Sequence, residues 1–109
     1  MTTFEKIVEA IKPFDIPYEP DIYHGSSPSH FVYNYADERG GLYGDDVPVS
    51  TIAAVQVHLY LPKDMSFTVL KKQVKKALLN QGFTYPEVTV LIEDKKRHIT
   101  FECEIEEEE

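Results

Sequence analysis

Histidine and cysteine are the side chains of this chain best suited to catalysis or metal binding, and their spacing favours neither. The four histidines lie in four different segments: His24, His30, His58 and His98. None belongs to an H-x-x-x-H or C-x-x-C pair, the spacings that place two metal ligands side by side. Cys103, the single cysteine, alternates with Ile99 and Phe101 and is expected to be a small core residue. We therefore expect no catalytic residue, no cofactor and no bound metal.

The glycine-rich and acidic segment 37–48 also lacks the spacing of a known catalytic or binding motif. Its three glycines match no nucleotide-binding fingerprint, and the neighbouring acidic residues would repel a phosphate. The acidic residues do not follow the alternate-position pattern of an EF-hand calcium loop. No G-x-S-x-G nucleophile turn occurs anywhere in the chain. An exposed loop is the prediction for this segment.

Charge is separated along the chain. The 109 residues carry a formal net charge of −8 at pH 7, and the C-terminal run 106–109 consists entirely of glutamates. This acidic balance argues against binding the phosphate backbone of a nucleic acid, which needs a positive surface. A second charged set lies in the predicted loop, and a group of lysines follows further along. These candidate contact residues are Asp37, Glu38, Arg39, Asp45, Asp46, Lys71, Lys72, Lys75 and Lys76.

Either charged set alone is typical of an ordinary solvated surface. Together they favour self-association, because a single chain gains nothing obvious from keeping opposite charges apart. In a closed ring, the acidic loop of one subunit could contact the lysines of the next, and the contact would repeat around the axis. We therefore treat the two sets as a candidate interface between subunits, or between a subunit and a partner.

Apolar periodicity predicts two helices that carry these residues. Positions 4, 7, 8 and 11 are apolar and predict a helix over 2–12, which Thr2 and Glu5 begin with the spacing of a capping box. A second helix is expected to be capped by Asp64 or Ser66 and to run to about Gln81. Its apolar stripe lies opposite the four lysines.

Alternating apolar residues predict strands before and after the second helix. The predicted strands cover residues 22–24, 30–36, 51–61, 88–92 and 99–105, with a turn at 94–96. One face of the segment 51–61 is apolar throughout and should meet the helices. Its other face is mixed and includes His58, beside which His98 and Glu102 are expected to lie.

These elements predict a single α+β domain over residues 1–105, with the order α-β-β-β-α-β-β. Two helices are expected on one face of a mainly antiparallel sheet of four to five strands. Residues 106–109 are expected to form a disordered acidic tail. The single cysteine, the absence of a leader-like N-terminus and the absence of a long apolar run favour a cytoplasmic protein with no membrane contact.

Four segments of the sequence resemble a known family. They are FVYNYADERG (31–40), VHLYLP (57–62), GFTYPEVTV (82–90) and RHITFEC (97–103). These segments are similar to small proteins of the head–tail morphogenesis modules of long-tailed phages and prophages of Gram-positive bacteria. Such proteins are described as tail terminators, tail completion proteins or minor capsid proteins. The resemblance extends from the first helix to Ile105 and brings no catalytic residues with it.

The resemblance implies a subunit that assembles into a ring, commonly a hexamer, in the host cytoplasm. The ring would end the growing tail tube, contact the tail-tube protein and the head connector, and stay in the neck of the virion. A minor capsid or head-completion protein on the connector side is the alternative within this structural class. A rival of another class is a small ligand-binding or enzymatic domain that uses the mixed sheet face around His58, His98 and Glu102.

Overall fold

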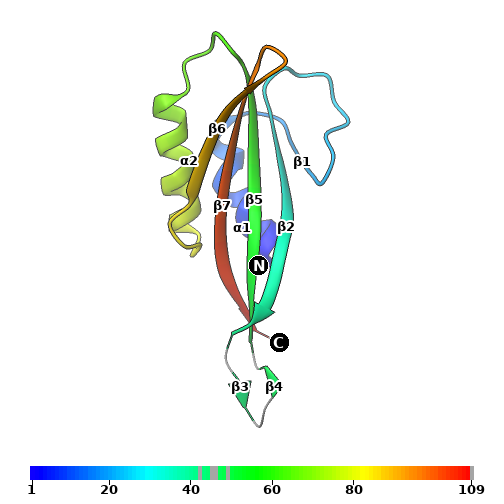
Figure 1. Ribbon diagram of the computed structural model, residues 1–109, viewed down its shortest axis with the longest axis vertical. Coiled ribbons are helices and arrows are strands. Elements are labelled where there is room, and N and C mark those ends of the chain that lie inside the picture. Colours follow the sequence, from blue (N-terminus) through cyan, green and yellow to red (C-terminus); the bar gives the residue numbers. More distant parts are fainter. Residues whose placement is uncertain (42, 45–46, 49, 109) are drawn as a thin grey trace.

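Two helices and a five-stranded sheet make up most of the chain in the computed structural model, which describes residues 1–41, 43–44, 47–48 and 50–108. The helices are α1 (Thr3–Ile11) and α2 (Thr68–Asn80), and a short 3₁₀ helix, Lys12–Phe14, follows α1. The sheet contains β1 (Tyr18–Pro20), β2 (His30–Gly40), β5 (Ser50–Pro62), β6 (Glu87–Glu93) and β7 (Lys96–Glu108). Figure 1 shows the elements, including the short strands β3 (Tyr43–Gly44) and β4 (Val47–Pro48). The α+β fold class is confirmed.

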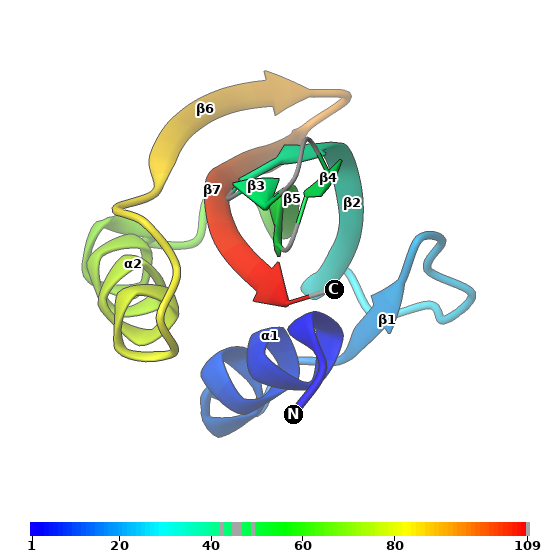
Figure 2. The ribbon, with the colours of Figure 1, turned by 90° about the horizontal axis from the view of Figure 1, so that it is seen from below.

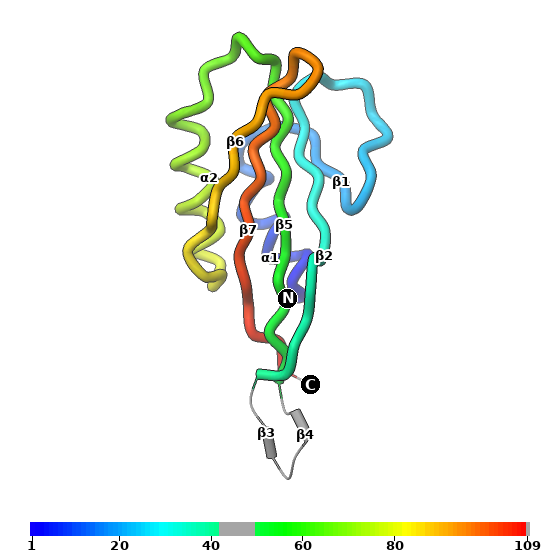
Figure 3. Tube along the Cα trace, viewed as in Figure 1, coloured from blue at the N-terminus to red at the C-terminus, as the bar shows by residue number. Residues whose placement is uncertain are grey.

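The strand order in the sheet is β1-β2-β5-β7-β6. All neighbouring strands are antiparallel except β1 and β2, which run parallel. β2, β5 and β7 lie side by side along most of the molecule (Figure 3). The turn between β6 and β7 is tight, because Asp94 and Lys95 both adopt positive φ angles of 49° and 67°.

The predicted alternation of β5 decides where the helices pack. Every second residue of this strand from Ala53 to Leu61 is buried, and the residues between them are only partly covered. The helices contribute Ile7 and Ile11 from α1 and Val74 and Leu78 from α2, all fully buried. The core therefore lies between the two helices and one face of the sheet, and the opposite face carries no helix (Figure 2).

The start of α1 has the capping box that the sequence predicts. The Thr2 hydroxyl accepts a hydrogen bond from the Glu5 backbone N–H at 3.1 Å, and the Glu5 carboxylate accepts one from the Thr2 backbone N–H at 2.8 Å. Both donors belong to the helix start, where no preceding turn supplies a carbonyl. The cap orients α1 so that Ile7 and Ile11 face the sheet.

We expect the substitution Thr2→Ala to lower the free energy of unfolding by about 1 kcal/mol, the usual cost of losing an N-cap side chain. The measurement is a urea titration followed by circular dichroism. The matched control is Thr2→Ser, which keeps the hydroxyl and should stay close to the wild-type chain. Equal losses in both variants would show that the cap contributes nothing and that another property of Thr2 matters.

The prediction of an exposed loop over 37–48 is wrong for its first part. Asp37–Gly40 belong to β2 and pair with residues 51–54 of β5, after a register shift between Tyr35 and Asp37. β5 continues past the helices, and its backbone N–H and C=O groups pair with those of Asp37–Gly40. The charged side chains of this segment can therefore lie on either side of the sheet. β3 and β4 pair with each other beyond it. Asp45 and Asp46 lie outside the described residues.

The prediction of a disordered tail over 106–109 is wrong for residues 106–108, which form a strand. Glu106, Glu107 and Glu108 are part of β7 and pair with residues 52, 51 and 50 of β5. These residues form a strand because β5 is long enough to pair with β2 on one side and with the end of β7 on the other. The domain therefore includes residues up to 108, and residue 109 lies outside the described part of the chain.

Two smaller boundaries differ from the prediction as well. The first strand is Tyr18–Pro20, which pairs with Phe31–Tyr33, and the segment 22–24 forms no strand. Helix α2 begins at Thr68 without a side-chain cap from Asp64 or Ser66. Phe67 precedes it and packs against the core, while the Arg97 guanidinium lies over its ring at 4.2 Å. No helix within the described residues is long and apolar enough to cross a membrane.

Candidate functional site

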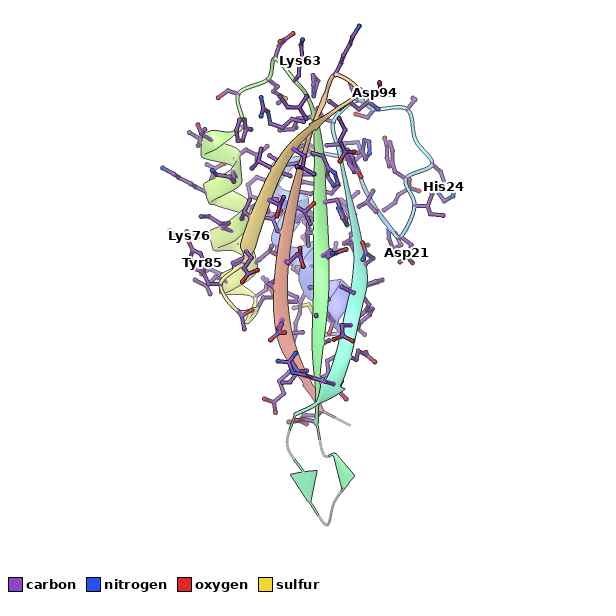
Figure 4. The ribbon with its side chains drawn as sticks, in the orientation of Figure 1. Asp21, His24, Lys63, Lys76, Tyr85 and Asp94 are labelled. Atoms are coloured by element: carbon purple, nitrogen blue, oxygen red, sulfur yellow. The ribbon has the colours of Figure 1, made fainter. Side chains whose placement is uncertain are left out.

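The four lysines of α2 form one surface, called here the lysine face (Lys71, Lys72, Lys75, Lys76). The core-facing stripe of α2 includes Val74 and Leu78, and on the other side of the helix Lys72 and Lys76 are exposed while Lys71 and Lys75 are half-buried. Figure 4 labels Lys76 and Tyr85 close together at the lower end of the helix. Lys75 donates a hydrogen bond to the Tyr85 hydroxyl at 3.1 Å, and its ammonium lies 5.1 Å from the centre of the tyrosine ring.

Apolar surface lies directly beside these charges. Leu79 is 45% exposed and Tyr85 is 67% exposed. Together with Lys72, Lys75 and Lys76 they line a shallow groove of about 350 Å³. Exposed apolar groups next to unpaired cations are more typical of a contact surface than of a purely solvated helix.

None of the four lysines has an ionic partner within the described residues. The ion pairs found there join Lys12 to Glu9, His24 to Glu19, Arg39 to Glu104 and His98 to Glu93. The chain nevertheless has more carboxylates than cations, at 19 against 11. The lysine face therefore keeps its charge available to a group outside its own fold.

The acidic residues gather at the opposite end of the sheet. β2, β5 and β7 extend past both helices (Figure 1), and their ends carry carboxylates on both sides. We call this the acidic end, and it comprises Asp37, Glu38, Glu104, Glu106, Glu107 and Glu108. The sequence prediction missed four of these residues, Glu104 and Glu106–Glu108, as contact candidates, although the alternation of Cys103 and Ile105 with glutamates was the signal for a continuing strand.

Some charges of the acidic end are satisfied internally. Arg39, predicted as an interface residue, forms two hydrogen bonds with the Glu104 carboxylate, at 2.8 and 3.0 Å. This contact holds the pKa of Glu104 below its usual value. The Glu107 carboxylate accepts hydrogen bonds from the hydroxyls of Thr3 and Tyr35, which join the end of β7 to α1 and β2.

The remaining carboxylates of the acidic end are free for a partner. Asp37, Glu38, Glu106 and Glu108 are exposed, and none forms an ion pair within the described residues. α2 and β2 lie on opposite sides of the molecule in both views (Figures 1 and 2), so Asp37 and Glu38 of β2 lie away from the lysine face of the same chain. Opposite charges on opposite sides allow one copy to contact the next.

The mixed sheet face carries a second cluster, the histidine pair. His58 Nδ1 lies 2.8 Å from His98 Nε2. His98 Nδ1 lies 3.1 Å from a Glu93 carboxylate oxygen, and His58 Nε2 lies 3.1 Å from the Asn34 amide oxygen. Burial lowers the pKa of His58, and the nearby His98 lowers it further. Among the described residues, no three His, Cys, Asp or Glu side chains converge as ligands for a metal.

Aromatic rings extend this cluster across the sheet. The Tyr60 ring stacks on His98 with centroids 4.4 Å apart, and His30 stacks between Tyr60 and Tyr23 at 4.9 and 3.8 Å. The sequence predicts His58 and His98 on one face, as the structure has them. It did not single out Asn34 or Glu93, because those contacts depend on the register of four strands.

The fold and these surfaces define an α+β domain that has a lysine face at one edge and an acidic end at another. No protein-family model matches the chain, and no curated protein matches it at a significant level.

Proposed function

We propose that the protein is a structural component of the head–tail junction of a long-tailed phage, and that its copies assemble into a ring that ends the tail tube. The four resembling segments of the sequence support this assignment, and one of them, 31–40, forms almost all of β2. In this proposal the protein has no enzymatic role. It acts by assembly, first in the host cytoplasm and then in the neck of the virion.

The observation that carries the proposal is the separation of unpaired charge. The lysine face has no internal ionic partner within the described residues, and the exposed carboxylates Asp37 and Glu38 lie on β2, on the side of the chain away from α2. Such a pair of unlike surfaces joins copies head to tail, and a head-to-tail contact closes into a ring when the rotation per subunit allows it. Complementary charge then sets the register between neighbours.

The contact is expected to involve several pairs at once. An exposed ion pair contributes only about 0–1 kcal/mol, so one lysine and one glutamate would not hold a ring together. The groove beside Leu79 and Tyr85 adds apolar area to the contact. The tail-tube protein and the head connector are the further partners, and a hexamer is the subunit number we propose. No sequence-specific nucleic acid and no membrane is among the partners.

The test reverses charge on the lysine face. In the double variant Lys72→Glu/Lys76→Glu, we expect ring assembly in the presence of the tail-tube protein to fall at least tenfold at low salt, because like charges would then oppose each other. Both side chains are exposed, so the subunit should stay folded. Native mass spectrometry and size-exclusion chromatography measure assembly, and circular dichroism measures folding.

Two further variants make this test specific. Lys63→Glu/Lys95→Glu imposes the same charge change at the end of the molecule where Figure 4 labels Lys63 and Asp94, away from Lys76, and should assemble normally. Adding Glu106→Lys/Glu108→Lys to the lysine-face variant should restore assembly, since the charges are then exchanged across the contact. Unchanged assembly of Lys72→Glu/Lys76→Glu at low salt would remove this contact from the proposal.

The same preparation distinguishes the two positions in the neck. A tail terminator should bind the end of the tail tube and stop its polymerisation. A minor capsid or head-completion protein should instead bind the connector and leave tube length unchanged. Measuring tube length by electron microscopy, with and without the protein, separates these outcomes. Failure to bind either partner would overturn the structural role.

A further inference from the structure

A chain of hydrogen bonds crosses the uncovered sheet face from β6 to β2. It runs from the Glu93 carboxylate to His98, from His98 to His58, and from His58 to the Asn34 amide oxygen. The orientation of the Asn34 amide is set by the backbone. Its nitrogen donates to the Tyr35 carbonyl oxygen at 3.1 Å, a group that accepts only, so the amide oxygen faces His58.

Counting protons along this chain gives a definite charge. The carboxylate and the amide oxygen at the two ends can only accept, so each needs an imidazole N–H. The central contact, between His58 Nδ1 and His98 Nε2, needs a third N–H. Two neutral imidazoles carry only two N–H groups between them. The three hydrogen bonds therefore require one additional proton and hence one positive charge on the two rings.

The other two protonation states leave at least one of the three contacts unsatisfied. With both rings neutral and both ends satisfied, two nitrogen lone pairs would face each other at 2.8 Å. With both rings protonated, two N–H groups would point at each other across the same distance. The Thr100 hydroxyl lies 3.2 Å from His98 Nε2 and 3.4 Å from His58 Nδ1. It can assist one nitrogen at a time and cannot place a hydrogen between the two.

We propose that His58 and His98 form a proton-binding site that holds a single proton, shared between His58 Nδ1 and His98 Nε2. The site places one pH-dependent positive charge on the uncovered sheet face. It goes beyond the proposed ring assembly and does not depend on it. The groups that face the pair come from each neighbouring strand: Asn34 and His30 from β2, Tyr60 from β5, Glu93 from β6, and Thr100 and Glu102 from β7.

Two steps of titration follow from this arrangement. Burial and the adjacent His98 lower the pKa of His58, while the carboxylates of Glu102 and Glu93 act in the opposite direction and favour the first proton, which completes the hydrogen-bonded chain. The first proton then opposes the second, because a second positive charge would lie on the adjacent ring. Between the two steps the pair holds one proton over a broad range of pH, whereas two independent histidines would both titrate near pH 6.5.

Nitrogen-15 NMR of the full chain tests the proton count directly. Long-range proton–nitrogen spectra of the imidazoles, recorded from pH 4.5 to 8.5, distinguish protonated from unprotonated ring nitrogens. We expect two steps separated by at least about 2 pH units, and a nitrogen–nitrogen coupling across the central hydrogen bond between them. Two independent titrations near pH 6.5, with no coupling, would overturn the proposal.

Variants of Asn34 give opposite shifts that a purely structural role would not produce. Asn34→Leu removes one acceptor, so two neutral rings can satisfy the remaining bonds, and the upper step should move down by about 1 pH unit. Asn34→Asp supplies a stronger acceptor and should move it up by a similar amount. Gln56→Leu is the control, since Gln56 contacts Asn34 and not the rings. Shifts of the same sign in both Asn34 variants, or none in either, would contradict a shared proton.

Discussion

Replacing Phe101 by alanine should lower the free energy of unfolding by about 3–5 kcal/mol, the range for truncating a fully buried aromatic side chain. Phe101 is 0% exposed and lies opposite Val57 of β5 and Val88 of β6 on the helix-covered face. Both helices pack against the same cluster, so the cavity cannot be filled by a shift of one element. A domain of ordinary stability would lose a large part of its free energy of unfolding.

The matched control is Glu102→Gln, one position along the same strand. Glu102 points to the uncovered face and is exposed, so its replacement should change stability by less than about 0.5 kcal/mol. Urea unfolding of both variants, followed by circular dichroism, gives the comparison. A loss below 1 kcal/mol for Phe101→Ala, or equal losses in the two variants, would contradict the placement of the core between helices and sheet.

The core was the part of the fold that the sequence predicted best. Strict alternation from Ala53 to Leu61 requires every second side chain to face one way, so the apolar set identifies the covered face without knowledge of the partner strands. The capping box at Thr2 was equally accessible, since it depends on residues three apart. These features are local, and local periodicity fixes them.

The ends of β2 and β7 could not be predicted from local pattern. Asp37–Gly40 and Glu106–Glu108 are charged or glycine-containing segments that look like loop and tail. Each gains its strand conformation from β5, which lies far away in the sequence and pairs with both. Past the helices neither side of the sheet needs to be apolar, so the usual alternation signal disappears there. The acidic end of the candidate interface was therefore only partly recognised.

Long-range contacts also decided the first strand and the start of α2. β1 pairs in parallel with β2 at the sheet edge, where Pro20 is tolerated because its missing N–H can face away from the ladder. α2 begins after Phe67, whose packing takes the place of a polar cap. The histidine pair depends on register across four strands, which fixes the 2.8 Å contact and which no spacing within one segment reveals.

The thiol of Cys103 should be nearly inert in the folded chain. The side chain is 4% exposed and belongs to the core cluster, and burial raises its pKa to about 12 from an ordinary value of 9.0. The thiolate is the reactive species, so at pH 8 its fraction falls about a thousandfold when the pKa rises by this amount. We expect alkylation of the native protein by iodoacetamide at pH 8 to be at least a thousandfold slower than alkylation in denaturing urea.

An exposed thiol on the same strand provides the matched control. The double variant Cys103→Ser/Glu102→Cys places the single thiol on the uncovered face, where it should react within about tenfold of the denatured rate. The comparison separates burial of the thiol from any general effect of the fold on the reagent. Adding Phe101→Ala to the native-cysteine chain should accelerate alkylation, because a less stable domain exposes Cys103 more often by unfolding. Native alkylation of Cys103 at a rate close to the denatured one would place this residue outside the core and contradict its assignment as a small core residue.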